Sequence, residues 1–248
     1  MPPSPTAEIG YSGNQNLPIT SSIPIACALS ETAYDSMQTT GKILSEANGS
    51  SFLRTTSNDQ YFDAAFGSVL VELARDFGVF PSFFFYDDGG VPNALATPRR
   101  VHPESDGTVL IGTTMLQNAM YIPGGDAGIL AIAAHEFGHI VVFKNADRLF
   151  NRVRGLPRFS LELHADFLSG YFLGKYEDRF PEIDVGGVGS VWLGLGSQDP
   201  TNPGTHGTVA MRRDAIQTGY SMVQDTPVIS FDQAFNAATD YIERYRPS

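Results

Sequence analysis

Apolar residues are concentrated in two long segments in the second half of the chain. The first extends from Ile129 to Phe143, and its apolar positions surround a helix on all sides instead of forming one stripe. A helix that is apolar all round is typical of the buried centre of a protein. Asp126, which follows Pro123-Gly-Gly, is a suitable N-cap for this helix. We therefore predict a central buried helix here.

The second apolar segment begins near Ser160 and predicts another helix. Four residues of this segment share one helix face because they are spaced four apart: Glu162, Asp166, Gly170 and Gly174. Glycine in a helix interior costs up to about 1 kcal/mol relative to alanine. We expect these glycines to let the second helix approach the first closely. The apolar residues on which the helix depends are Leu161, Leu163, Ala165, Phe167, Leu168, Phe172 and Leu173.

Shorter patterns predict the remaining elements of an α+β fold. The β-branched segment 108–114 predicts a strand, which we place at the edge of a small mixed or antiparallel sheet, with an interior strand as the alternative. A firm helix begins at Asp59 or Asp63 and is ended by Gly78. Further helices are expected over 25–48, 115–121, 212–223 and 231–245.

Two segments lack the pattern of regular structure. Residues 1–24 are rich in Pro, Ser and Thr and predict an extended arm, followed by a single domain over 25–248. The Gly-, Ser- and Pro-rich stretch 186–207 is too long for a simple connection, so we interpret it as a functional loop near a cleft.

Composition limits the partners and the compartment. With 248 residues, 42% of them hydrophobic, the chain can build a substantial core. A net charge of −11 argues against nucleic acid or an anionic membrane as a partner. The chain has no uninterrupted run of eighteen apolar residues, so we expect no membrane span. Leu17–Leu29 makes a poor signal peptide. We expect a soluble protein, with the cytoplasm favoured and secretion possible if a leader has been removed.

The chain has one cysteine, Cys27, which allows no internal disulfide and gives no zinc-cluster spacing. Because it lies in the N-terminal region, its thiolate could cover a metal ion in a precursor. A buried structural thiol is the commoner situation for a single cysteine.

Inside the first helix stands the motif His135-Glu136-x-x-His139. Residues four apart lie on one helix face, so the two imidazoles can converge on one Zn²⁺. Glu136 then lies beside the metal, where its carboxylate can act as a general base toward water. The alternative is a core helix whose two histidines and glutamate are satisfied by other partners, at a cost of several kcal/mol if those partners are weak.

A catalytic zinc site needs a third protein ligand, and the second helix supplies one in Glu162. Asp166, one turn later, can accept the outer N–H of a ligating imidazole. Two alternatives remain open: His164, which points to another face, or Asp166 itself as the third ligand. A metzincin would need glycine and histidine where this chain has Val142 and Asn145, so that class is excluded.

The pattern His135-Glu136-x-x-His139 followed by Glu162-x-x-Ala165-Asp166 resembles the gluzincin metallopeptidases. It is most similar to the bacterial neutral zinc metallopeptidases and the soluble minigluzincins, which are related to heat-shock and CAAX-processing membrane proteases. The resemblance covers about residues 60–222. It includes the segments 83–88, 93–97 and 107–116, which resemble a strand, an N-A-x-A turn and an edge strand, and Thr205-His206-Gly with Arg212 downstream.

The resemblance implies a zincin-like fold and a role for each matching residue. His135, His139 and Glu162 would ligate Zn²⁺, and Asp166 would orient a ligand histidine. Glu136 would be the general base and later the proton donor. The resemblance also implies that His206 and Arg212 face the oxyanion or the substrate backbone. The alternatives are a loop histidine at 206 and a solvated basic pair formed by Arg212 with Arg213.

Together these patterns predict a zinc-dependent metalloendopeptidase. Its peptide or unfolded-protein substrate would add to the edge strand near Val109–Ile111 through main-chain hydrogen bonds. Two other classes stay open: a zinc-binding module without proteolytic activity, and a precursor whose N-terminal arm, up to about residue 50, lies in the cleft.

Overall fold

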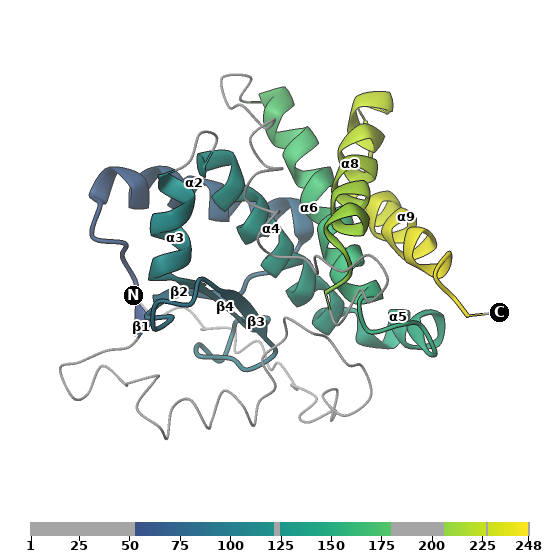
Figure 1. The fold of residues 1–248 in the computed structure, drawn as a ribbon, viewed down its shortest axis with the longest axis horizontal. Helices are drawn as coiled ribbons and strands as arrows, with labels where there is room; N and C mark the ends of the chain where they lie inside the picture. The colour runs from purple at the N-terminus through teal and green to yellow at the C-terminus, as the bar shows by residue number, and fades with distance from the viewer. Residues whose placement is uncertain (1–52, 122–124, 180–205, 227, 248) are drawn as a thin grey trace, which may run out of the picture.

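The computed structural model describes residues 53–121, 125–179, 206–226 and 228–247 (Figure 1). The expected N-terminal arm, the helix over 25–48, Cys27 and most of the loop at 186–207 lie outside the described residues. The division of the chain into an arm and one domain therefore stays a prediction.

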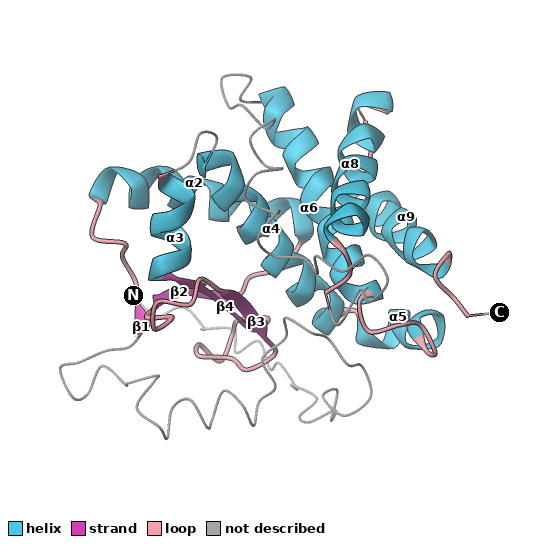
Figure 2. Cartoon of the chain, viewed as in Figure 1, coloured by secondary structure: helices cyan, strands magenta, loops and turns pink. Residues whose placement is uncertain are grey.

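The described chain combines helices with one small mixed sheet, which confirms the α+β class (Figure 2). The order of the four strands is β1-β2-β4-β3. β2 and β4 are parallel, and the other two pairs are antiparallel. The strands are β1 (Leu53–Arg54), β2 (Ser82–Tyr86), β3 (Ala94–Thr97) and β4 (Thr108–Gly112).

The prediction that the strand at Val109–Ile111 forms the sheet edge is wrong. β4 pairs with β2 on one side and β3 on the other, and every residue of β4 is buried. Among the described strands the edge beside the helices is β3, in the segment that the resemblance suggested as a turn. A short β-branched run fits an interior strand equally well, because periodicity alone does not tell how many neighbours a strand has.

The helix predicted from Asp59 is confirmed as α2 (Gln60–Phe77). The Asp59 carboxylate accepts hydrogen bonds from the backbone N–H groups of Tyr61 and Phe62, which would otherwise lack partners at the helix start. Gly78 ends the helix with φ 62°, in the left-handed region where glycine carries no steric penalty. The predicted helix at 115–121 corresponds to α3 (Thr113–Met120).

The two apolar segments form α4 (Gly125–Lys144) and α6 (Ser160–Arg179). By length and composition alone α4 could cross a membrane, but 89% of its most apolar window is buried inside the protein. That burial is typical of a central core helix. α4 contacts α2, α3, β3 and β4 as well as α6, so it lies between the sheet region and the helices of the C-terminal half (Figure 1).

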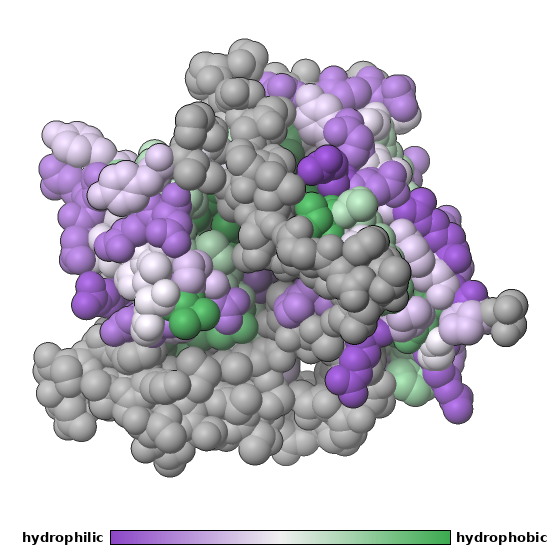
Figure 3. All heavy atoms as spheres, viewed as in Figure 1, coloured by the Kyte–Doolittle hydropathy of each residue, from purple (hydrophilic) through white to green (hydrophobic). Residues whose placement is uncertain are grey.

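Three further helices complete the described fold. α8 (Val209–Asp225) and α9 (Phe231–Glu243) confirm two predicted helices and pack against α6. α5 (Ala146–Val153) was not predicted, because in so short a segment only a few positions are apolar. Its Arg148 and Arg152 bind acidic side chains of α9. Hydrophilic side chains predominate on the visible surface over α8 and α9, with some apolar ones among them (Figure 3).

Glycines let α6 approach a neighbouring helix closely, but that neighbour is α8. A Cβ added to Gly170 would lie 2.0 Å from the carbonyl oxygen of Ile216, and one on Gly174 would lie 3.0 Å from that of Tyr220. Gly219 of α8 faces the backbone of Phe167 in the same way, at 2.0 Å. The expectation that Gly170 and Gly174 face α4 is therefore wrong.

The close contact between α4 and α6 instead uses Gly138, which lies inside the H-E-x-x-H motif. A Cβ there would be 3.0 Å from the Cα atom of Ala165. Ser169 fastens the same two helices, since its hydroxyl donates to the carbonyl oxygen of Ala131 at 2.8 Å. Gly138, which directly precedes His139, thus brings α6 against the face of α4 that carries the two histidines.

We predict that Gly170→Ala lowers the free energy of unfolding by about 1–3 kcal/mol, because the new methyl group meets backbone that cannot move aside cheaply. Gly67→Ala in α2 is the matched control. Nothing lies within 4 Å of a Cβ at that position. There, alanine should raise stability by about 0.5–1 kcal/mol through helix propensity. Urea unfolding of both variants measures the difference, and equal effects would contradict the close contact.

Candidate metal centre

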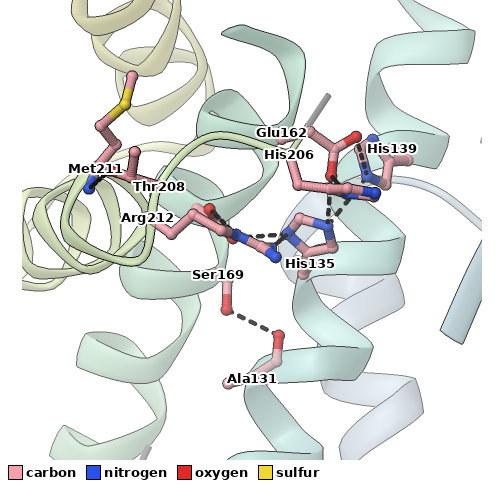
Figure 4. A network of polar contacts seen from close by, with 10 residues as sticks. Ala131, His135, His139, Glu162, Ser169, His206, Thr208, Met211 and Arg212 are labelled. Atoms are coloured by element: carbon pink, nitrogen blue, oxygen red, sulfur yellow. Dashed lines mark hydrogen bonds and ion pairs between the residues drawn. The ribbon is translucent and has the colours of Figure 1, made fainter. Parts of the chain in front are cut away.

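Three buried side chains from α4 and α6 converge at the contact between these helices (Figure 4). His135 Nε2 lies 3.1 Å from His139 Nε2. Glu162 Oε2 is 3.7 Å from His135 Nε2, and Glu162 Oε1 is 3.6 Å from His139 Nε2. The three side chains are 2% exposed or less. They are arranged as in an H-E-x-x-H metal site with a carboxylate from a second helix.

These separations fit a single divalent ion. Donor atoms about 2.0–2.1 Å from a tetrahedral Zn²⁺ are about 3.3 Å from one another. The donor set of two imidazoles and a carboxylate suits zinc and several other divalent metals. Two ring nitrogens that face each other can share at most one proton, so a cation satisfies all three donors better than hydrogen bonds alone. The group can therefore hold a metal ion, whose identity the geometry does not fix.

The electrostatics favour the metal-binding forms of two ligands. Burial lowers the pKa of His139 to about 3, so its imidazole is neutral and has a lone pair for a metal. Burial acts to raise the pKa of Glu162, but contacts with His139, His135 and His206 hold it well below its usual value. Glu162 is therefore a carboxylate, and neither side chain has to lose a proton before binding a cation.

His135 differs from His139 because it has an acidic partner on its outer side. Its Nδ1 atom lies 2.8 Å from Asp166 Oδ1. Although burial opposes a charge, the Asp166 carboxylate raises the pKa of His135 to about 9. The ring therefore carries a second proton at neutral pH. A metal bound at Nε2 would take the place of that proton, and Asp166 would keep the ring oriented. Among the described residues none forms a hydrogen bond with Nδ1 of His139.

Glu136 lies next to the donor group without belonging to it. It is 2% exposed, and its Oε2 atom has no hydrogen-bond partner among the described residues. Burial, with the nearby carboxylate of Glu162 as a smaller cause, raises the pKa of Glu136 to about 8. A divalent cation close by would lower this pKa. The side chain thus has the unsatisfied oxygen and the tunable proton affinity that a general base requires.

Asp166 is bound from its other side by Arg212. The guanidinium donates from Nε to Oδ2 and from Nη2 to Oδ1, both at 2.8 Å. Arg212 is 2% exposed, whereas its neighbour Arg213 is exposed, so the two do not form a solvated basic pair. Burial acts to raise the pKa of Asp166, but Arg212 and His135 lower it. That Arg212 faces the substrate stays a prediction.

His206 lies at the partly exposed side of the group. Its Nδ1 atom is 3.3 Å from Glu162 Oε2, and its side chain is 39% exposed. It is therefore more than a distant loop histidine, because it contacts one of the three donors directly. This contact does not test the predicted role of His206 toward the substrate, which stays a prediction.

The alternative third ligands do not join the donor group. His164 points to α9, where its Nε2 atom lies 3.4 Å from Thr239 Oγ1 and its ring packs on Phe235. Burial lowers the pKa of His164 to about 3. Asp166 directs its oxygens to His135 and Arg212, as described above. Of the acidic side chains that the structure describes on α6, Glu162 is the one in the donor group.

Sequence reasoning missed two contacts around this group. One is the bidentate pairing of Arg212 with Asp166, and the other is the hydrogen bond from Ser169 to α4. A buried serine in an apolar helix signals a polar partner, although the sequence does not say which one.

Comparisons with models of known protein families, with curated proteins and with solved structures find no match for this chain. The likeness to gluzincins therefore rests on the motif residues and on the geometry of the donor group.

We predict that the purified chain binds one divalent ion and that Glu162→Ala weakens this binding by more than about 100-fold, the upper range for loss of a mere outer partner. Equilibrium dialysis with Zn²⁺ measures both. His102→Ala is a suitable control, because His102 is exposed and lies outside the donor group. Equal binding by wild type and Glu162→Ala would contradict the assignment of Glu162 as a ligand.

Proposed function

We propose that this protein is a zinc-dependent peptidase of the metalloendopeptidase type. The observation that carries the proposal is the buried group of His135, His139 and Glu162, with Glu136 beside it and with no fourth His, Cys, Asp or Glu of the described residues in the group. A set of three protein ligands that leaves one coordination position open is typical of catalytic zinc sites, whereas structural sites are closed by four.

When bound, Zn²⁺ supplies a Lewis acid that acidifies water and polarises a carbonyl group. The remaining chemistry belongs to the chain. Glu136 accepts the proton of the attacking water and later donates it to the nitrogen of the leaving amine. Burial raises the pKa of Glu136 to about 8, and a bound divalent cation would lower it again, which would leave a carboxylate that can accept the proton and return it.

Negative charge develops on the substrate carbonyl oxygen during the attack, and a donor aimed at this oxygen lowers the barrier by about 3–4 kcal/mol. In our proposal His206 is this donor. Its support is twofold: it contacts the ligand Glu162, and its side chain is partly exposed where the other members of the group are buried.

The proposed substrate is an extended polypeptide that pairs with β3. β3 ends the sheet among the described strands and packs against α4, the helix that carries the two histidines. Main-chain pairing of this kind accepts many sequences, as expected for a peptidase that acts on unfolded protein.

A zinc-binding module without catalytic activity is the second candidate. The burial of all three donors and of Glu136 favours it, because a structural site needs no access for a substrate. A zinc-loaded wild-type chain that cleaves neither casein nor a peptide library would support this candidate. The inhibited-precursor alternative concerns residues 1–50, which lie outside the described part of the chain.

We predict that Glu136→Gln reduces peptide hydrolysis by about 10²–10⁴-fold, the usual contribution of a general acid–base residue. Zinc stoichiometry should stay that of wild type, because Glu136 is not among the donors. Glu104→Gln, which changes an exposed glutamate in the same way, is the control. Casein cleavage and metal content are measured on the same samples. Near-normal turnover by Glu136→Gln would show that another group is the base.

A further inference from the structure

The first turn of α8 and the residues just before it contact the outer side of the metal centre at two points. His206 reaches Glu162, as described above, and Arg212 reaches Asp166. The two residues stand on either side of Thr208, whose hydroxyl caps α8 by accepting a hydrogen bond from the backbone N–H of Met211 at 3.2 Å. One helix end thus supplies partners for a direct donor and for the carboxylate behind another donor (Figure 4).

Arg212 ends a chain of contacts that leads to a metal-binding nitrogen. Two parallel hydrogen bonds of 2.8 Å join its guanidinium to both oxygens of Asp166. The Oδ1 atom of Asp166 is also 2.8 Å from Nδ1 of His135. Nε2, on the other side of the same ring, is the atom that faces His139 and Glu162. The orientation of the guanidinium therefore fixes the carboxylate, and the carboxylate fixes the ring.

The end of α8 that carries Arg212 is held rigidly, because the backbone of α8 packs directly against the backbone of α6. Gly170 and Gly219 allow approaches that a methyl group would block at 2.0 Å. Arg212 is among the largest fully buried side chains of the described residues, so the surrounding core restricts its conformation. A long and flexible side chain is in this way held in one geometry.

We propose that Arg212 is a positioning residue, which holds Asp166 and through it the His135 imidazole in the orientation that binds the metal. This role replaces the predicted contact with the oxyanion, because the fork of donors is directed at Asp166 and the side chain is 2% exposed. The inference rests on the metal site of the proposed function, and peptide hydrolysis is not needed for it.

The planar fork of arginine distinguishes this role from that of a buried positive charge. A guanidinium binds both carboxylate oxygens at once and prevents the carboxylate from rotating. The ammonium of lysine is a point charge that keeps the electrostatic attraction and loses the paired geometry. Arg212→Lys therefore separates positioning from charge.

The test measures the dissociation constant of Zn²⁺ by competition with a chelating dye, on the full chain. Loss of an outer partner of a ligand costs about 10–100-fold in metal affinity. Because Arg212 acts mainly through Asp166, with one longer contact of 3.4 Å between its Nη2 atom and Nδ1 of His135, we expect Arg212→Lys to weaken Zn²⁺ binding by about 10-fold. Arg213→Lys is the matched control, since Arg213 is the exposed neighbour on the same helix, and should bind as wild type does.

Two further measurements test whether Arg212 affects Zn²⁺ binding through Asp166 and the His135 ring. In an Asp166→Asn background, Arg212→Lys should cause a smaller loss than in wild type, because both changes break the path through Asp166 and only the 3.4 Å contact between Arg212 Nη2 and His135 Nδ1 is separate from it. The visible spectrum of the Co²⁺-loaded protein should change in Arg212→Lys and stay unchanged in Arg213→Lys, because it reports ligand geometry. If Arg212→Lys does not fold, Arg212→Gln, which keeps one amide donor toward Asp166 and loses the paired fork, should show the same loss of Zn²⁺ affinity and the same spectral change.

Several results would overturn the inference. One is wild-type Zn²⁺ affinity in Arg212→Lys, with or without a loss of stability in the metal-free protein, since a purely structural role would affect stability alone. Another is tighter binding in Arg212→Met together with unchanged binding in Arg212→Lys, which would show an effect of charge only. A wild-type chain that binds no Zn²⁺ would overturn the inference and the proposed function together. A chain that binds Zn²⁺ and shows the predicted losses but hydrolyses nothing would overturn only the proposed function.

Discussion

The structure depends on how buried charge is balanced where α4 and α6 meet. Glu162 and Asp166 are buried carboxylates with lowered pKa values, and Arg212 supplies the one permanent positive charge among the residues described at this contact. Burying an unpaired ion costs several kcal/mol. In the metal-free protein the proton of His135 offsets the second carboxylate. A divalent cation would replace this proton and would also lower the pKa of Glu136, so that its side chain would be the carboxylate that the proposed base role requires.

The residues that set this balance were visible in the sequence because they violate the local pattern. His135, Glu136 and His139 interrupt an apolar run, and the spacing of Glu162 and Asp166 marks a polar face on another apolar helix. Helical periodicity placed His135 and His139 on one helix face and favoured Glu162 as the third donor, with His164 and Asp166 as alternatives that the structure removes. The pairing of strands could not be predicted in the same way, because the apolar run of β4 is compatible with one neighbour or with two.

The positions of small residues explain why the contacts between the helices were not predicted correctly. Glycines on a helix face indicate that a neighbour approaches closely, but they do not identify that neighbour. Gly170 and Gly174 share a face with Glu162 and Asp166, and this suggested α4, whereas the structure packs them on α8. The α4 contact needs only Gly138 and Ala165. The sequence indicates only that small residues let a helix approach its neighbours, and the three-dimensional arrangement is needed to assign each interface to its helices.

This arrangement makes helix packing part of the metal chemistry. Gly138 brings Glu162 to the two histidines, and the glycines between α6 and α8 bring Arg212 to Asp166. A shift of about 1 Å between α4 and α6 would separate the Glu162 oxygens from the histidine nitrogens, which now lie 3.6 to 3.7 Å apart. The affinity for a metal ion would then depend on the contacts among three helices. Because the donors come from separate segments of the chain, a metal that binds them also stabilises the folded state that brings them together.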